Sequence, residues 1–230
     1  GVKGDIDKLL ADKDPKTTEL YEMAKQVLFE ADEKKVIKAN GVYRFFPAQA
    51  KGNDVLIFDP NDHTKLVEQF SFPRQSQPPY LCLADYLKPI NSGVMDYVGL
   101  FAVTSGIGAR EIANSLKDEG EYLRSHTIQA LALELAEAFA EKLHQAMREK
   151  WGYPDPAELK MQDRFAGRYR GIRISLGYPA CPNLEDQVKL FRLLNVVEIG
   201  INLTDGFMMD PEASVSSIVF AHPEARYFSV

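Results

Sequence analysis

Cysteine is scarce in this 230-residue chain, which contains only Cys82 and Cys181. Two cysteines so far apart provide neither a disulfide framework nor the CxxC pair of a structural zinc site. We therefore expect two reduced thiols in a cytoplasmic protein. Cys82 lies in the apolar run 80–83, where a buried and unreactive thiol is expected.

Long apolar runs and an excess of basic residues are also missing. No stretch approaches the ~20 apolar residues that cross a bilayer, and the first residues lack the apolar core of a signal peptide. The chain carries 27 Lys and Arg against 33 Asp and Glu, a net charge of -6. Phosphate binding needs clustered basic residues, so this balance argues against nucleic acid or an anionic membrane as a partner.

The spacing of apolar residues predicts the secondary structure. Three- and four-residue spacing indicates helices, and alternating or continuous apolar runs indicate strands. Residues 105–108 are expected to end the strand before them, and 70–77 to be extended but irregular. Helices are predicted at 4–35, 109–119, 125–151, 158–170 and 185–194, and strands at 42–47, 54–59, 97–104, 199–207 and 216–222.

This order of elements predicts an α+β fold with a mainly antiparallel sheet flanked by long helices. The Lys-Gly-Asn turn at 51–53 predicts a hairpin between the first two strands. Apolar residues lie all around helix 125–151, so we expect that helix to be buried over much of its circumference. We expect one domain, with 1–35 as its helical part and 36–230 as the remainder.

Common catalytic motifs are absent from the sequence. It contains no HExxH, GxSxG or complete phosphate-binding glycine loop. Among the four histidines, His63 is expected in a turn and His144 on the surface, paired with Glu141 one helical turn away. An independent acid-base enzyme that uses Glu137 and His144 is the weakest reading.

The unusual stretch is 168–182, RYRGIRISLGYPACP, with three arginines in six residues. Its two prolines remove amide donors and exclude a regular helix or a central strand. Gly177 permits close backbone approach, Tyr178 offers a flat ring, and Arg173 offers a planar fork for a carboxylate. These features suit a small zwitterion with an aromatic base. A structural proline loop with solvated arginines explains them equally well.

Residues 173–182 also match a family signature, RxxxGYPACP. In these residues the chain resembles the C-terminal activation domain of cobalamin-dependent methionine synthase. The resemblance extends over most of the chain from about residue 40. Other similar stretches are 81–86, 96–104, 137–144, 151–153, 213–216 and 220–223.

The resemblance implies a helmet-shaped domain that binds S-adenosylmethionine in a shallow site. It implies a reactivation reaction in which cob(II)alamin receives one electron from a flavoprotein, flavodoxin or a diflavin reductase, and is then methylated. Cobalamin would be bound by another module of the enzyme, and zinc by its homocysteine module. Cobalt would be the nucleophile, so this domain needs none of its own and would contribute proximity.

The same resemblance implies roles for single residues. Arg173 would bind the carboxylate of the ligand. Glu137 would interact with the positively charged ammonium or sulfonium group of the ligand, although pairing with Lys142 is an alternative. The loop whose backbone would line the adenosyl group comprises Gly177, Tyr178, Pro179, Ala180 and Cys181.

The sequence departs from the family pattern in several places. Tyr227 and Phe228 match an aromatic pair beside the ligand, but Phe228 replaces a tyrosine of some members and lacks its hydroxyl. Residues 183–187 differ from the family's helix start. The Asp-Trp-x-Pro-Phe segment and any DxHxxG corrinoid motif are absent, so we expect a fragment of a larger enzyme. A docking module for the reductant and the cobalamin domain, without a ligand site, is the alternative function.

Overall fold

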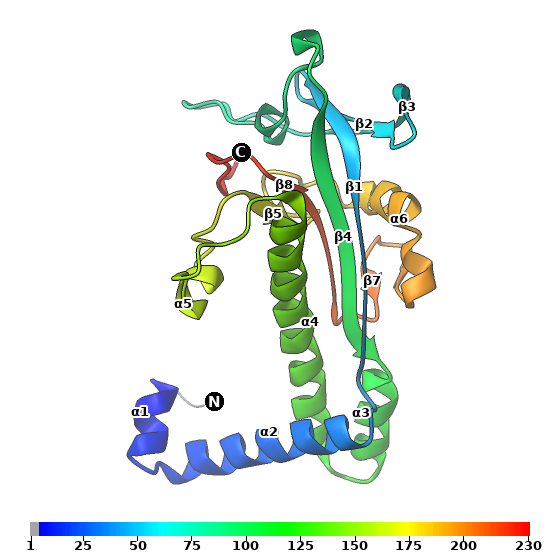
Figure 1. Ribbon diagram of the computed structural model, residues 1–230. Helices are drawn as coiled ribbons and strands as arrows, with labels where there is room; N and C mark the ends of the chain where they lie inside the picture. Colours follow the sequence, from blue (N-terminus) through cyan, green and yellow to red (C-terminus); the bar gives the residue numbers. More distant parts are fainter. Residues whose placement is uncertain (1–4) are drawn as a thin grey trace.

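The computed structural model describes residues 5–230, and residue 4 of the first predicted helix lies outside this range. Its centre is a six-stranded, entirely antiparallel sheet in the order β3-β2-β1-β4-β8-β5 (Figure 1). A separate pair, β6 and β7, lies outside this sheet. The strands are β1 (Lys38–Lys51), β2 (Asp54–Asp59), β3 (Asp62–Ser71), β4 (Asp96–Ile107), β5 (Ile172–Ile174), β6 (Asn202–Leu203), β7 (Met209–Asp210) and β8 (Ser214–Phe220).

Helices flank the sheet, and the longest of them, α4, runs along β4 and β8 (Figure 1). None of the helices described over residues 5–230 is long and apolar enough for a membrane span. The α-helices are α1 (Ile6–Ala11), α2 (Pro15–Glu33), α3 (Ala109–Asp118), α4 (Tyr122–Trp151), α5 (Met161–Phe165) and α6 (Gln187–Leu194). The 3₁₀ turns are η1 (Leu83–Tyr86), η2 (Ile90–Ser92), η3 (Leu184–Asp186) and η4 (Val196–Ile199).

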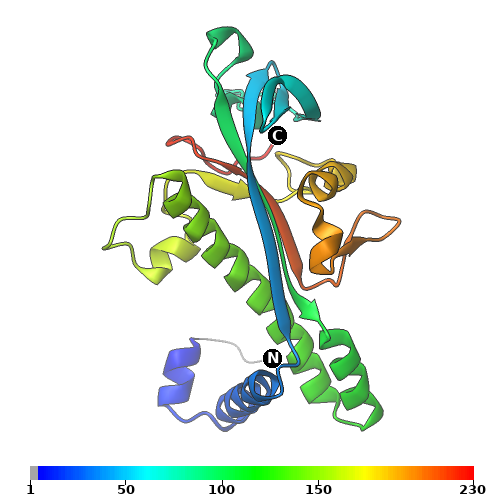
Figure 2. The same ribbon diagram turned by 45° about the vertical axis from the view of Figure 1, so that its right-hand side comes forward.

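The sheet is covered on both faces, which the alternation along β4 makes plain. Phe101 and Val103 pack in a cluster with the alanines of α4, whereas Leu100 and Ala102 pack in the opposite cluster with α6. In Figure 2, α4 and α6 lie on opposite sides of the strands. The apolar run 97–104 therefore forms a strand buried on both faces, as its composition predicts.

Several predicted boundaries are wrong. The first helix is divided at residues 12–14, because Asp14 caps a new helix by accepting the amide of Thr17 at 2.8 Å. Strand β4 continues through the predicted break to Ile107. Strand β3 lies at the sheet edge and is largely exposed, so its sequence lacks the apolar run that indicates a strand. Of the helix predicted at 158–170 only α5 forms, and of the strand at 199–207 only β6.

Helix α4 is buried along a narrow stripe rather than around its circumference. Ala138, Lys142 and Ala146 are exposed, which contradicts the prediction of a broad buried surface. Small side chains at four-residue intervals let the helix approach the sheet closely. The buried stripe consists of Ser125, Ile128, Ala132, Ala136, Ala140, His144, Met147 and Arg148.

Candidate functional site

Arg173 lies in the middle of β5, the edge strand that pairs only with β8 in the sheet. Gly171 precedes this strand at φ +81°, and a Cβ there would come within 2.4 Å of the Phe220 carbonyl oxygen. The glycine therefore allows the chain to approach β8 closely enough for pairing. The Arg173 side chain is only 18% exposed, so a planar cation is held at the rim of the sheet.

Two glutamates of α4 contact Arg173. Its Nη2 donates to Glu137 Oε2 at 3.2 Å, and its Nε lies 3.6 Å from Glu141 Oε2. Burial opposes the charge of Arg173, but Glu137 and then Glu141 outweigh it and hold its pKa above the ordinary value. The two glutamates differ in exposure, at 61% for Glu137 and 12% for Glu141. Only Glu137 can therefore move away into solvent at little cost.

The proline-rich loop after β5 is closed by its own hydrogen bonds. Gly177 adopts φ +96°, and its amide donates to the Cys181 carbonyl at 2.9 Å. The Cys181 amide donates to the Tyr178 carbonyl at 2.8 Å. The Cys181 thiol is buried against the Ser175 carbonyl at 3.0 Å, and burial raises its pKa to about 12. The loop is thus rigid, and its thiol is protonated at neutral pH.

A depression of about 170 Å³ opens between this loop, β5 and α4. The exposed ring of Tyr178 lies on one side, and Tyr227 donates its hydroxyl to the Arg173 carbonyl at 2.7 Å. The fold therefore brings together four of the residues predicted from the sequence. The complete lining is Glu137, Arg173, Ile174, Ser175, Tyr178 and Tyr227.

Other residues predicted for the site lie beside this depression rather than in its wall. Within the loop, Ala180 and Cys181 are buried and Pro179 is exposed, and none of the three lines the depression. Phe228 packs on Tyr86, with ring centroids 6.5 Å apart. Gly177 shapes the turn without lining the depression. The roles of these residues toward a ligand remain predictions.

Sequence reasoning missed Ile174, Ser175 and Glu141. Ser175 lies inside the signature and bonds the Ser217 hydroxyl at 3.1 Å. Glu141 follows Glu137 by four residues, a spacing that places two helical side chains on one face. That spacing is the signal that could have identified Glu141.

His144 is fully buried, which contradicts its predicted place on the surface. Burial, and then the charges of Arg148 and Arg173, lower its pKa well below 6.5. A solvent-accessible acid-base pair with Glu137 is thereby excluded. Among residues 5–230, no three His, Cys, Asp or Glu side chains are grouped as metal ligands.

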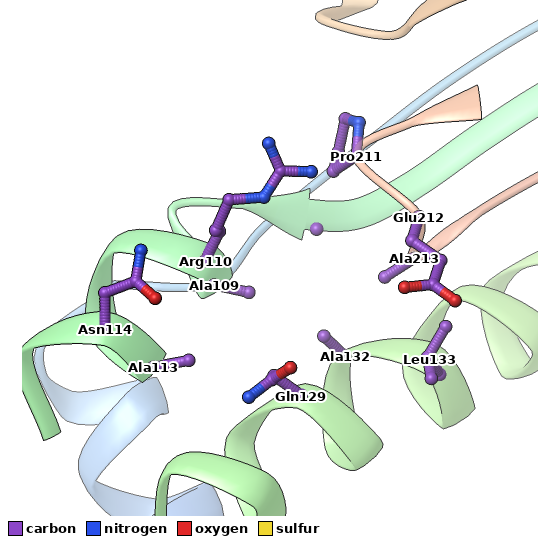
Figure 3. A pocket seen from close by; sticks show the side chains of 11 residues that line it. Ala109, Arg110, Ala113, Asn114, Gln129, Ala132, Leu133, Pro211, Glu212 and Ala213 are labelled. Atoms are coloured by element: carbon purple, nitrogen blue, oxygen red, sulfur yellow. The ribbon is translucent and has the colours of Figure 1, made fainter. Parts of the chain in front are cut away.

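A second depression, of about 130 Å³, lies between α3, α4 and the residues before β8 (Figure 3). Small side chains form much of its wall, among them Ala109, Ala113 and Ala132. Arg110, another of its lining residues, is paired with Asp210. The two depressions share no lining residue, so this one is separate from the site at Arg173.

Comparison with known proteins agrees with the signature. Residues 2–230 match the family described as "Vitamin B12 dependent methionine synthase, activation domain". The chain is also similar to a solved structure described as "Crystal Structure of the MetH Reactivation Domain bound to AdoHcy", with 33% sequence identity and a TM-score of 0.93. That match covers 99% of this chain and 73% of the other. On this agreement in sequence and fold, the chain belongs to the family of activation domains of vitamin B12-dependent methionine synthase, a methyltransferase.

Proposed function

We propose that this chain binds S-adenosylmethionine in the depression at Arg173 and presents its methyl group to a corrinoid held by another module. The observation that carries the proposal is the position of the Arg173 guanidinium. It lies in the wall of the depression, where Glu137 and Glu141 of α4 hold it. The similar reactivation domain was solved with AdoHcy, the product left when S-adenosylmethionine has lost its methyl group.

The residues present fit such a ligand. An ion pair with an exposed partner is worth at most about 1 kcal/mol, so Glu137 can release Arg173 to a ligand carboxylate. Glu137 then remains within reach of the ligand's ammonium group. The ring of Tyr178, 57% exposed, offers an uncovered face to the adenosyl end.

The two thiols of the chain are compatible with a ligand that carries a reactive methyl group. S-adenosylmethionine supplies an electrophilic methyl group, and a reduced corrinoid supplies the nucleophile. Burial raises the pKa of both Cys82 and Cys181, so neither offers a thiolate that would compete for the methyl group. The contribution of this chain is to hold the donor in place, which is a proximity effect.

The partners follow from the same proposal. The cobalamin-binding domain of the enzyme would dock over the open side of the depression, and a flavodoxin or diflavin reductase would supply the electron. Cobalamin and zinc would be held by other modules. A docking role without a ligand site remains the alternative.

Calorimetric titration of S-adenosylmethionine into the 230-residue chain tests the proposal. Saturable binding is expected, and Arg173→Ala should weaken it by roughly 1.5–3 kcal/mol, the range for hydrogen bonds to charged groups. Arg168→Ala is the matched control, because Arg168 lies in the same segment but pairs with Asp163 and is absent from the lining. No heat at millimolar ligand would favour docking alone, and equal effects of the two variants would remove Arg173 from the site.

A further inference from the structure

A buried polar cluster lies directly behind Arg173, and the proposed function does not use it. It joins α4 to the chain just before β5. Four of its polar atoms have no hydrogen-bond partner within residues 5–230: Glu141 Oε1, both ring nitrogens of His144, and Arg148 Nη1. Unpaired buried polar atoms are costly, so a cluster that contains several of them calls for a reason beyond packing. The members of the cluster are Glu141, His144, Arg148, Asp155 and Tyr169.

Tyr169 is the centre of this cluster. The guanidinium carbon of Arg148 lies 3.8 Å from its ring centroid, and the His144 ring meets it edge-on at 5.1 Å. Its hydroxyl donates to Glu141 Oε2 at 3.3 Å. Burial, and then the charge of Glu141, raise the pKa of Tyr169 far above its ordinary value. The hydroxyl therefore keeps its proton, so Tyr169 is the donor of this hydrogen bond and Glu141 the acceptor.

Glu141 lies between two arginines and faces each of them with a different oxygen. Arg148 already binds Asp155 in a bidentate pair, at 2.6 and 2.7 Å, and its Nη2 is 3.8 Å from Glu141 Oε1. The other oxygen, Oε2, faces both the Tyr169 hydroxyl and Arg173 Nε. Arg173 thus has a fixed inner partner in Glu141 and an exchangeable outer partner in Glu137.

We propose that Tyr169 and Glu141 are positioning residues that hold the Nε side of Arg173 inward, so that its Nη nitrogens stay aimed at the ligand's carboxylate. This inference rests on the proposed ligand site at Arg173. Fixing a recognition group through residues behind it is a common way to keep its geometry. Neither residue touches the ligand, so their effect appears only in the part of binding that depends on the carboxylate.

Two ligands separate this role from a structural one. S-adenosylhomocysteine carries the amino acid end, whereas 5′-methylthioadenosine has the same adenosyl thioether without it. Tyr169→Phe keeps the ring that contacts Arg148 and His144 and removes only the hydroxyl. We expect it to weaken S-adenosylhomocysteine roughly three- to tenfold, the effect of one hydrogen bond, and to change methylthioadenosine by less than about twofold. Glu141→Gln should show the same selectivity.

Further variants complete the test. In an Arg173→Ala background, Tyr169→Phe should cause no additional loss, because its effect passes through Arg173. Tyr153→Phe is the control, since the Tyr153 hydroxyl is also buried but has no hydrogen-bond partner within residues 5–230.

Several results would overturn the inference. Equal weakening of both ligands would indicate a structural role, and unchanged affinity for both would indicate no role. A Tyr169→Phe chain that does not fold would show that the hydroxyl serves the fold and not Arg173. Failure of the unaltered chain to bind S-adenosylhomocysteine would instead contradict the proposed function. This failure can be distinguished from the others because the unaltered chain is measured before any variant.

Discussion

Replacing His144 should reduce the loss of unfolding free energy that occurs as the pH falls below about 6.5. The side chain is fully buried, and neither ring nitrogen has a hydrogen-bond partner within residues 5–230. Burial, and then Arg148 and Arg173, push its folded pKa well below 6.5. An unfolded chain takes up a proton at this histidine near pH 6.5, but the folded chain does not. The unfolded state therefore binds more protons as the pH falls.

The sign and size of the effect follow from linkage. Because the folded pKa is depressed, the stability contributed by a neutral His144 is fully present above pH 6.5 and declines below it. The slope approaches about 1.4 kcal/mol per pH unit until the folded pKa is reached. Between about pH 7.5 and pH 5.5, the unfolding free energy should fall by roughly 1.4 kcal/mol through this residue alone.

Urea unfolding of the chain and of His144→Phe across this pH range measures the effect. Phenylalanine keeps an aromatic edge against Tyr169 and cannot take up a proton. Its unfolding free energy should lack the wild-type decline, and the difference between the two curves removes contributions shared by both proteins. Asp155 makes such a shared contribution. Burial raises the pKa of this carboxyl, but the Arg148 hydrogen bond and charge outweigh burial and lower it, so Asp155 changes the unfolding free energy only at lower pH.

His126→Phe is the control for this experiment. His126 lies on the same helix but is exposed, so its replacement should leave the slope unchanged. Parallel curves for wild type and His144→Phe would refute the reasoning. They would mean that His144 gains a proton in the folded protein, between two arginines.

Two other substitutions test the frame around the site. Asp155→Asn leaves the fully buried Arg148 without its hydrogen-bonded counter-charge and should cost about 3–5 kcal/mol in urea unfolding, whereas Asp163→Asn, at a more exposed position, should cost less than about 1 kcal/mol. Equal costs would contradict a buried pair. Gly171→Ala should destabilise by more than about 2 kcal/mol, because positive φ adds strain and its Cβ meets a β8 carbonyl. Gly120→Ala has the same positive φ but nothing within 4 Å, so a loss as large there would mean that strain, not the contact, decides.

The strands that could be predicted are those whose sequence reflects their burial. The run 97–104 is apolar at nearly every position because both faces of β4 are covered. The turn at 51–53 is encoded locally, and the structure confirms the hairpin of β1 and β2. Strand β3 could not be found in this way, because much of it is exposed and nothing in its own sequence requires a partner.

His144 was misplaced for a different reason. Ala132, Ala136, Ala140 and His144 follow one another at four-residue spacing and form a single buried stripe. A stripe of small residues gives a weak apolar signal, and larger apolar residues lie all around this helix, so its sequence does not single out the buried face. Small residues are buried where a helix approaches a sheet closely, and this depends on the sheet rather than on the helix. The burial of a titratable group on that stripe is therefore a tertiary property.

The site also combines a part that the local sequence determines and a part that only the tertiary fold brings together. The loop conformation is local, because proline and a glycine at φ +96° determine much of it, and the signature therefore located Arg173 and Tyr178. The partners of Arg173 come from α4, 32 and 36 residues earlier in the sequence, and from Tyr227, 54 residues later. No spacing rule connects these segments. Only the pairing of β5 with β8 beside α4 brings them together.

The position of Arg173 on an edge strand also bears on the proposed transfer. A methyl donor that must meet a corrinoid on another module has to be held firmly on one side and left open on the other. The inner side is firm, since Glu141 is buried beneath the Tyr169 hydroxyl. The outer side is open, because Tyr178 and Tyr227 are both more than half exposed. A central strand would cover both sides, so the edge position is the one that lets the same arginine be fixed by the fold and still reach a ligand.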